Sequence, residues 1–299
     1  MKKYFLLIAA AVAALAISSC KKDGDKKTPD TTGGVSVASE NLVAYFPLNS
    51  AEDVITLGEG VSVATLGGQA EFNEKGFRGG AYNNKSADHE TQAYLKLNVP
   101  KDFLSKLSSF TVTAWVNSPT QRGGIITFDG GADANWGGWD MFYDGGDDKG
   151  TTFKGYMFST KTEWGGFFPN FKSEAIVANQ WIQVGFSYDE NTSYANLWVN
   201  GVLVGPVDEE AQKILGTSTC WAGPEDAEGN QEKVGKVVQP DVTCMYIGAF
   251  ASRETGKSSE VWLSYFAGKI DEIRVFNKAL SEEEMLALYK AEVKVSDLD

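Results

Sequence analysis

Short apolar segments with a period of two recur along the chain from residue 41 onward. Phe110–Asn117 (FTVTAWVN) alternates β-branched and aromatic residues, and 180–189 places four apolar side chains on one face. Asn200-Gly201, between two further apolar runs, is a strong signal for a tight hairpin. Alternation over four to eight residues predicts strands. Many short strands separated by Gly, Asn and Asp turns predict an all-β fold in which two antiparallel sheets pack as a sandwich.

The same pattern extends over most of the chain. It predicts further strands at 41–48, 94–97, 124–129, 139–144, 154–160, 194–204, 245–250 and 266–276, whereas residues 49–69 read as irregular. One short helix is expected near the end of the chain. Ser281 precedes three glutamates and an apolar stripe, and Glu284 stands three residues after it, which is the spacing of a capping box.

The amino end predicts export and lipid anchoring. Lys2 and Lys3 precede an apolar run of 13 residues that is too short to span a bilayer and has the form of a secretory signal. The run ends in Ile-Ser-Ser-Cys, which resembles a lipobox. We therefore expect residues 1–19 to be a lipoprotein signal peptide, Cys20 to be the lipidated mature N-terminus, and 20–40 to be a flexible tether.

Charge narrows the classes of partner. Removing residues 1–19 removes Lys2 and Lys3 and leaves 25 basic against 40 acidic residues, a net charge of −15. A chain this acidic is a poor partner for nucleic acid or for an anionic membrane surface. The charged residues after Cys20 resemble the export tags of surface lipoproteins, so we expect an outer-membrane, surface-exposed lipoprotein; a periplasm-facing linker is the alternative.

Two cysteines remain besides Cys20. Cys220 and Cys244 form an even pair in an oxidising compartment, so we expect a disulfide between them, with two unpaired buried thiols as the alternative. The acidic, Gly-rich stretch 208–241 that precedes Cys244 reads as a long loop insertion.

Three motifs in order carry a family resemblance. The chain reads LVAYF at 42–46, FTVTAWV at 110–116 and FAGKIDEIRVFN at 266–277, the last followed by ALS and the predicted helix. This set resembles laminin-G-like, concanavalin A-like lectin/glucanase domains. The resemblance implies a jelly-roll sandwich over 41–290 with a short C-terminal helix, followed by an acidic tail at 291–299.

The resemblance also implies a structural calcium ion. Related domains often carry one, and oxygen ligands suit that ion. Asp271, in the IDE segment, is the expected ligand, together with Asp53 or Asn49 near the first strand. The alternative is that Asp271 accepts backbone amide hydrogen bonds or pairs with Arg274.

The usual catalytic arrangements are absent from the sequence. Glucanases on this fold carry E-x-D-x-x-E on one strand, and Asp271-Glu272 does not fit that spacing. His89 is the only histidine, which excludes a multi-histidine zinc site, and it reads as a loop residue. We therefore expect a protein that is not an enzyme.

Stretch 129–171 is rich in aromatic and acidic residues separated by glycine. Aromatic rings stack on the apolar faces of sugars, and carboxylates or amides bind their hydroxyls. Strand aromatics are also needed for the core, so core packing is the alternative for part of this set. The candidate glycan-binding residues are Trp136, Trp139, Asp140, Tyr143, Trp164, Phe168 and Trp221.

The sequence thus predicts a surface-anchored lipoprotein that binds a glycan or polysaccharide without cleaving it. One alternative is an adhesion or assembly module that binds a protein partner through 208–243. Another is a glycoside hydrolase with a non-standard carboxylate pair.

Overall fold

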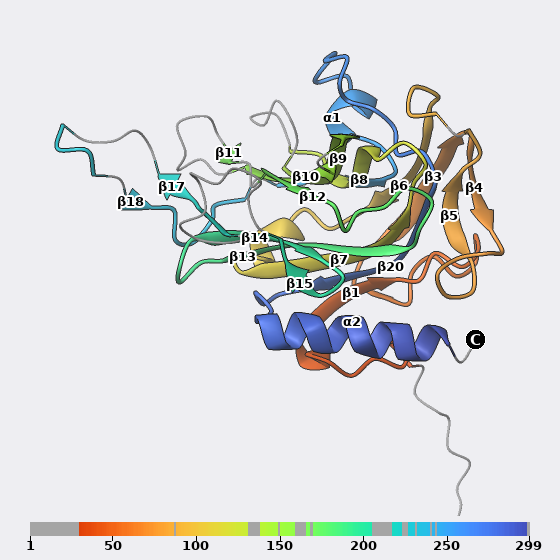
Figure 1. The fold of residues 1–299 in the computed structure, drawn as a ribbon, viewed down its shortest axis with the longest axis horizontal. Helices are drawn as coiled ribbons and strands as arrows, with labels where there is room; N and C mark the ends of the chain where they lie inside the picture. The colour runs from red at the N-terminus through yellow and green to blue at the C-terminus, as the bar shows by residue number, and fades with distance from the viewer. Residues whose placement is uncertain are drawn as a thin grey trace, which may run out of the picture. The chain divides into compact units, whose positions relative to one another are not determined.

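Two antiparallel sheets face each other across a hydrophobic core (Figure 1). The structure is a computed structural model. It describes residues 30–86, 88–130, 138–148, 150–158, 166–167, 170–204, 217–222, 227–230, 232–239, 241–242 and 244–297. Within these ranges the expected all-β, two-sheet architecture is confirmed.

The larger sheet contains ten strands among the described residues. They are β1 (Leu42–Phe46), β2 (Leu57–Gly58), β4 (Ala70–Asn73), β5 (Ala81–Asn84), β7 (Phe110–Asn117), β13 (Ile182–Asp189), β14 (Tyr194–Val199), β15 (Val202–Leu203), β16 (Thr217–Thr219) and β20 (Lys269–Phe276). Their order is β15-β14-β13-β7-β20-β1-β2, with β16 paired to β14, β5 to β20 and β4 to β5. The first and last long strands are therefore neighbours.

The smaller sheet contains eight described strands. They are β3 (Ser62–Gly68), β6 (Ala93–Asn98), β8 (Arg122–Phe128), β9 (Trp139–Asp147), β10 (Gly150–Phe158), β11 (Gly166–Phe167), β12 (Asn170–Ser173) and β19 (Cys244–Ile247). Their order is β11-β10-β9-β8-β19-β6-β3, and β12 pairs with β10. The remaining elements are the pair β17 (Trp221–Ala222) and β18 (Glu232–Lys233), the helices α1 (Ala251–Glu254) and α2 (Glu282–Ser296), and the 3-10 turns η1 (Ser39–Asn41) and η2 (Leu104–Lys106).

Two regions differ from the sequence-based expectation. Residues 49–69 contain β2 and β3, although they read as irregular. β3 lies at the edge of its sheet with most of its side chains exposed, so no apolar face marks it in the sequence. The insertion expected at 208–241 also contributes β16, β17 and β18 within its described part.

The C-terminal helix α2 covers the outer face of the larger sheet (Figure 1). Its start is the expected capping box, since Ser281 Oγ accepts from the Glu284 amide at 3.2 Å and Glu284 Oε2 accepts from the Ser281 amide at 2.9 Å. Apolar side chains of the helix and sheet form a second, smaller core made of Val35, Trp198, Phe276, Leu280, Met285 and Leu288. The larger sheet is therefore buried on both faces, which explains why β7 is buried along nearly its whole length.

Charged residues are buried beneath this helix. Arg274 lies on β20 and contacts two carboxylates, Glu272 at 2.9 Å and Glu292 of α2 at 3.3 Å. The guanidinium also stacks on the Tyr45 ring at 4.1 Å, and the Tyr45 hydroxyl donates to Glu272. We call Tyr45, Glu272, Arg274 and Glu292 the helix-anchoring network, because it joins α2 to β1 and β20.

The helix-anchoring network also binds the start of the domain. Arg274 donates to the Thr32 carbonyl, and Arg78 donates to the Gly33 carbonyl. Gly33 has a φ of +59°, and an added Cβ would lie 2.5 Å from the Tyr45 hydroxyl, so glycine is required there. Residues 31–40, predicted as part of the tether, pack against the sandwich. Residues 291–296, predicted as the start of an acidic tail, lie within α2.

The expected Cys220–Cys244 disulfide is not formed in the structure. Cys220 is buried in the core between the sheets, with its backbone amide bonded to the Ser193 carbonyl beside β14. Cys244 lies on β19 of the other sheet, and its side chain packs with Tyr246 and Ala251 on the outer face. The Cys220 thiol therefore lies between the two sheets and the Cys244 thiol on the outer face of the smaller sheet. This agrees with the alternative of two buried thiols.

In the described part of the chain, no helix has both the length and the apolar character needed to cross a bilayer.

Candidate functional site

The outer face of the smaller sheet carries the functional candidates. Alternation along β9 sends Trp139, Met141 and Tyr143 into the core and places Asp140 and Phe142 on the outer face. The segment from Phe250 to Tyr265, which includes α1, runs across part of this face (Figure 1). Unlike the outer face of the larger sheet, this face carries no long helix among the described residues.

The structure divides the predicted glycan-binding residues. Trp139 and Tyr143 pack in the core with 3 % and 2 % exposure, so neither can stack on a sugar without opening the sandwich. They follow the core-packing alternative. Trp136, Trp164 and Phe168 lie outside the described residues, as does the side chain of Trp221, and their role stays a prediction.

Asp140 occupies an unusual position for a carboxyl group. It is 3 % exposed and is flanked by Thr127 of β8 and Tyr156 of β10, its partners in register. Burial raises the pKa of Asp140 well above its ordinary value, and one of its oxygens has no hydrogen-bond partner among the described residues. Burial and the nearby Asp140 also raise the pKa of Tyr156. The sequence predicts Asp140 as a glycan-binding residue, and this stays a prediction; the structure buries its side chain, so a ligand would reach it only if this face opened.

An aromatic cluster adjoins Asp140 on the same face. It consists of Phe142, Tyr156, Phe158, Phe250 and Leu263, with Trp262 partly buried against them. The Phe142 and Phe250 rings meet edge to face at 5.0 Å, and the Trp262 ring stacks on Phe142 at 6.0 Å. The cluster fixes the 250–265 segment to the sheet and leaves part of Trp262 at the surface.

Tyr265 assembles a pocket beside this cluster from three distant segments. The Gly124 amide donates to the Ser264 carbonyl, and Gly124 forms a parallel bridge with Tyr265, which holds the start of β8 against the 250–265 segment. The Tyr265 amide donates to the His89 carbonyl. The Tyr265 hydroxyl donates to Glu254 at 2.7 Å, and the Arg253 guanidinium stacks on its ring at 4.4 Å. Burial and this acidic partner raise the pKa of Tyr265 to about 12.

Close packing of glycine permits this assembly. Gly123 has a φ of +109°, and an added Cβ would lie 2.3 Å from the Tyr265 carbonyl oxygen. Only glycine lets the β8 backbone approach the 250–265 segment this closely. The approach places Arg122, the residue before Gly123, at the wall of the pocket.

We call this cavity the Tyr265 pocket. Its volume is about 450 Å³, and it is lined by His89, Glu90, Arg122, Arg253, Ser259, Glu260, Val261 and Ser264. The two arginines and His89 are half-buried, whereas Glu90 and Glu260 are exposed. The wall is therefore rich in hydrogen-bond donors, and the acidic groups stand at the rim. A volume of this size accommodates a small saccharide or a comparable polar molecule.

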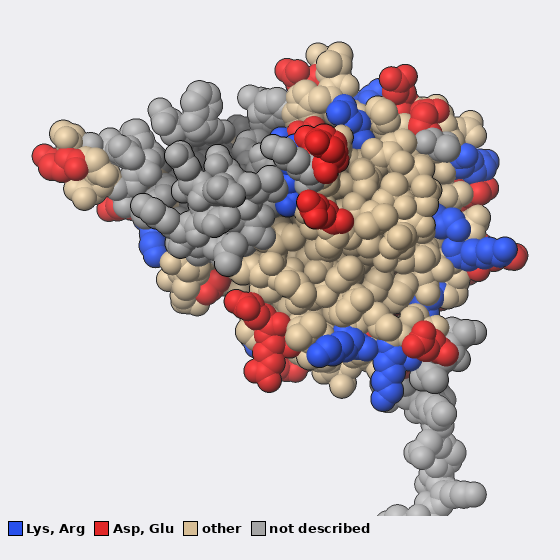
Figure 2. Space-filling view, in the orientation of Figure 1, with Lys and Arg blue, Asp and Glu red and all other residues tan. Residues whose placement is uncertain are grey.

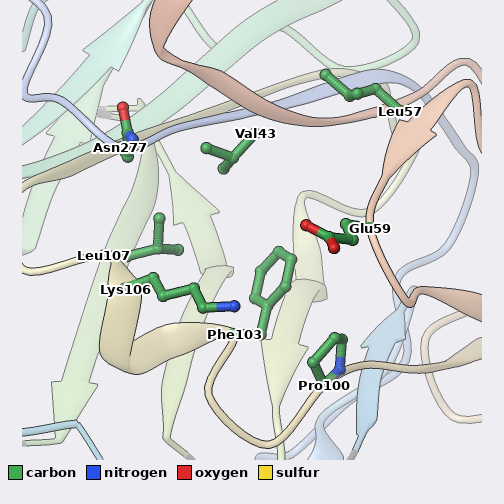
Figure 3. A pocket seen from close by; sticks show the side chains of 8 residues that line it. All are labelled: Val43, Leu57, Glu59, Pro100, Phe103, Lys106, Leu107 and Asn277. Carbon is green, nitrogen blue, oxygen red and sulfur yellow. The ribbon is translucent and has the colours of Figure 1, made fainter.

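A second pocket lies between the β1–β2 edge and the segment around η2 (Figure 3). Its volume is about 460 Å³, and its walls include Val43, Leu57, Phe103 and Leu107. Lys106 lines it as well, but that lysine pairs with Asp102 at 2.7 Å. With mainly apolar walls, this pocket offers few of the directed hydrogen bonds that a sugar needs.

The residues expected to bind calcium are arranged differently from a cation site. Asp271 accepts hydrogen bonds from the amides of Phe77, Arg78 and Glu272 at 2.8 to 3.0 Å, so both of its oxygens face N–H groups. Burial, and secondarily Glu272, raise its pKa. Asp53 is exposed and accepts from the Asn49 side chain. Asp271 thus follows the backbone-amide alternative, and calcium binding stays a prediction.

Sequence reasoning missed the residues that form the Tyr265 pocket. His89 was set aside as a loop residue, and Arg122, Arg253 and Tyr265 were not selected. They stand far apart in the sequence, and they are brought together by the isolated bridge between Gly124 and Tyr265 and by the hydrogen bond from the Tyr265 amide to the His89 carbonyl. The Gly123-Gly124 pair was the one local signal, because consecutive glycines in a strand mark a close backbone approach.

The comparisons with known proteins agree with this fold. The family model described as "Concanavalin A-like lectin/glucanases superfamily" matches residues 89–242, just over half of the chain. No curated protein matches the sequence.

Solved structures with the same fold include receptor-binding domains of botulinum neurotoxins. The binding domain of serotype G gives a TM-score of 0.54 at 14% identity, covering 84% of this chain and 51% of that chain. The receptor-binding domain of the C/D mosaic serotype gives 0.53 at 14%, with 84% and 51% covered. The binding domain of type DC, solved with rat synaptotagmin II, gives 0.54 at 12%, with 86% and 52% covered. This chain spans about half the length of those structures, and at such identity the likeness shows the fold alone.

Proposed function

Because this chain belongs to the concanavalin A-like lectin/glucanases superfamily, we propose that it is a non-catalytic module that binds a glycan in the Tyr265 pocket. The observation that carries the proposal is the pocket itself. It lies on the sheet face that no long helix of the described part of the chain covers, and its walls offer guanidinium, imidazole and hydroxyl groups beside the partly exposed Trp262. Directed hydrogen bonds next to an aromatic surface are the two features that a sugar site needs.

The proposal favours binding over hydrolysis. Two carboxylates line the pocket, Glu90 and Glu260, but both are exposed. The general acid of a glycosidase relies on burial or a like charge to stay protonated near neutral pH. Asp140 is buried as such an acid would be, yet it does not line the pocket. Release of reducing sugar from any polysaccharide that the protein binds would contradict this part of the proposal.

A pocket-filling variant tests the site. Ser259 is exposed at the rim, so Ser259→Trp should occupy the pocket without disturbing the core. Ser62→Trp, at an exposed position on the edge strand β3 of the same sheet, is the matched control. On a glycan array and then by calorimetry with the best ligand, we expect Ser259→Trp to weaken binding at least tenfold and the control to bind as the wild type does.

The outcomes separate the site from the function. Equal binding by both variants would place the glycan elsewhere, and alanine variants of Trp136, Trp164, Phe168 and Trp221 would then test the residues that the sequence selected. Absence of binding to every glycan tested would contradict the function itself.

We also propose that the module is anchored by lipid at Cys20 to the outer membrane and faces the exterior. The short apolar run and the lipobox-like ending at Cys20 support this. Many copies on one membrane would raise the avidity for a polymer that carries repeated sites. Incorporation of labelled palmitate that is lost in Cys20→Ser would support the anchor, and labelling that persists would contradict it.

A further inference from the structure

The four arginines of this chain are divided between two places. The chain has 23 lysines and only four arginines. Arg78 and Arg274 bind the backbone of Thr32 and Gly33 around the helix-anchoring network. The other two, Arg122 and Arg253, both line the Tyr265 pocket. Arginine differs from lysine in presenting a planar fork of donors that matches a carboxylate or sulfate with two parallel hydrogen bonds.

Arg122 has no acidic partner among the described residues. Asp144 stands opposite it in the β8–β9 register, but Asp144 pairs with Lys154 at 2.5 Å. The Arg122 guanidinium lies instead over Gly145, whose added Cβ would be 3.0 Å from it. It is half-buried and carries its charge into the pocket wall.

Arg253 is held without an ion pair in the described structure. Its guanidinium stacks on the Tyr265 ring, and one nitrogen donates to the Leu263 carbonyl at 2.5 Å. These contacts fix the group in place, and no carboxylate of the described residues forms an ion pair with it. The Tyr265 ring stacks with Arg253, and the Tyr265 backbone contacts the two glycines that follow Arg122, so one residue joins the segments that carry the two arginines.

The surroundings make this local charge distinctive. The chain has a net charge of −13, and on the face seen in Figure 2 the Lys and Arg side chains are interspersed with Asp and Glu. An anionic ligand therefore gains nothing from the protein's overall field and must be recognised locally. Glu90 and Glu260 at the exposed rim would repel an anion that is too short to place its charge at the inner wall.

We propose that the glycan of this protein is anionic and that its carboxylate or sulfate group binds between Arg122 and Arg253. This inference rests on the proposed function and specifies its ligand class. Carboxylate and sulfate share the chemistry that the guanidiniums recognise, and the source must be distinguished by experiment.

Matched polymers make the test. Affinity electrophoresis of the full protein compares polygalacturonate with the same polymer after its carboxyl groups are reduced to alcohols, and dextran sulfate with dextran. We expect binding to at least one anionic polymer and a loss of tenfold or more when its charge is removed, the usual range for a charge-assisted hydrogen bond. A loss of binding on reduction of polygalacturonate identifies carboxylate as the recognised group, and weaker binding to dextran than to dextran sulfate identifies sulfate.

Variants of one arginine then locate the effect. Arg122→Gln removes a guanidinium that makes no hydrogen bond among the described residues, so the fold should tolerate it, and we expect a loss of tenfold or more toward the anionic polymer. Arg122→Lys should retain part of the affinity. Lys96→Gln removes a cation that lies over the Tyr246 ring outside this pocket and should change nothing.

Three results would overturn the inference. Neutral polymers bound as tightly as their anionic counterparts would leave the glycan function standing and refute the anionic class. An Arg122→Gln variant that binds the anionic polymer like the wild type would refute the site. Failure to bind any polymer, neutral or anionic, would refute the proposed function together with this inference.

Discussion

Glu292 should make the stability of the sandwich fall as pH rises through the neutral range. Burial, opposed in part by Arg274 and reinforced by Glu272, raises its pKa from the ordinary 4.5 to about 7. The main physical reason is that burial beneath α2 disfavours the charged form of Glu292, and the charge of Glu272, which contacts the same Arg274 guanidinium, adds to this effect. Between the two pKa values the folded protein holds a proton that the unfolded chain has released.

The sign and the size of the change in the free energy of unfolding follow from this difference in bound protons. Because the folded pKa is raised, the stabilising contribution is complete below the unfolded pKa and is lost as pH rises toward the folded one. Each pKa unit corresponds to about 1.4 kcal/mol, so the shift amounts to about 3 kcal/mol in the free energy of unfolding. This is a large share of the 5–15 kcal/mol that a typical domain possesses.

Urea denaturation at about pH 4.5 and about pH 8, followed by tryptophan fluorescence, measures the effect. Glu292→Gln keeps an oxygen that can accept from Trp115 and Gln183, which donate to the native carboxylate at 2.7 and 2.6 Å. We expect the variant to gain about 3 kcal/mol relative to the wild type between the lower and the higher pH. Asp140 and Asp271, whose pKa values are also raised, titrate in both proteins and cancel.

The exposed Glu283 on the same helix supplies the control. Glu283→Gln makes the same chemical change at an exposed position and leaves the helix-anchoring network in place, so it should not reproduce the gain of about 3 kcal/mol expected for Glu292→Gln. The reasoning fails if the Glu292→Gln difference is independent of pH. It fails equally if the Glu292→Gln variant becomes less stable relative to the wild type as the pH rises.

Three further predictions concern the same structure. Arg274→Met leaves two buried carboxylates unpaired and should destabilise the fold by roughly 3–5 kcal/mol, more at high pH than at low; a loss below ~1 kcal/mol in urea denaturation would show that the network is not buried as described. Gly33→Ala should lower the melting temperature in calorimetry, because the added Cβ would lie 2.5 Å from the Tyr45 hydroxyl; an unchanged value would mean that the segment before η1 is not packed. Cys220 and Cys244 should both react with a thiol reagent after unfolding without reductant, and a protein that yields neither thiol would restore the disulfide.

The local sequence pattern was sufficient to predict several strands, a hairpin turn and the start of the C-terminal helix. The alternation in FTVTAWVN predicted β7 to the residue, Asn200-Gly201 predicted the β14–β15 turn, and Ser281 with Glu284 predicted the helix start. These signals succeed because strand period, turn chemistry and helix caps depend on residues close in sequence.

The burial of Glu292 and the positions of the two cysteines depend on tertiary contacts, which the local sequence pattern does not show. Glu292 stands in a stretch that reads as an acidic tail, yet it is fully buried because α2 continues through Ser296 and turns that face toward Arg274. The Cys220–Cys244 pairing failed for a similar reason, since a shared oxidising compartment does not place two thiols on the same side of a sheet. The burial of Glu292 depends on Trp115 and Gln183, which are more than a hundred residues away in the sequence. The direction of the Cys244 side chain depends on which face of its sheet packs against the other sheet.

The candidate site was predictable only in part, for the same reason. Local composition drew attention to residues 139–143 of β9, but Trp139 and Tyr143 point into the core and Asp140 is buried outside the Tyr265 pocket. Arg122, Arg253 and His89 meet only because Tyr265 crosses the start of β8.

The two faces of the sandwich use arginine for opposite purposes. On the larger sheet, Arg274 is neutralised by Glu272 and Glu292 and is sealed beneath α2, where its charge stabilises the fold and meets no ligand. On the smaller sheet, Arg122 has no acidic partner among the described residues, because the carboxylate of Asp144 that stands opposite it pairs with Lys154. Retaining an unneutralised, half-buried guanidinium has an energetic cost that a purely structural role would remove with one acidic neighbour. The arrangement is understandable if the missing anion is supplied by the ligand.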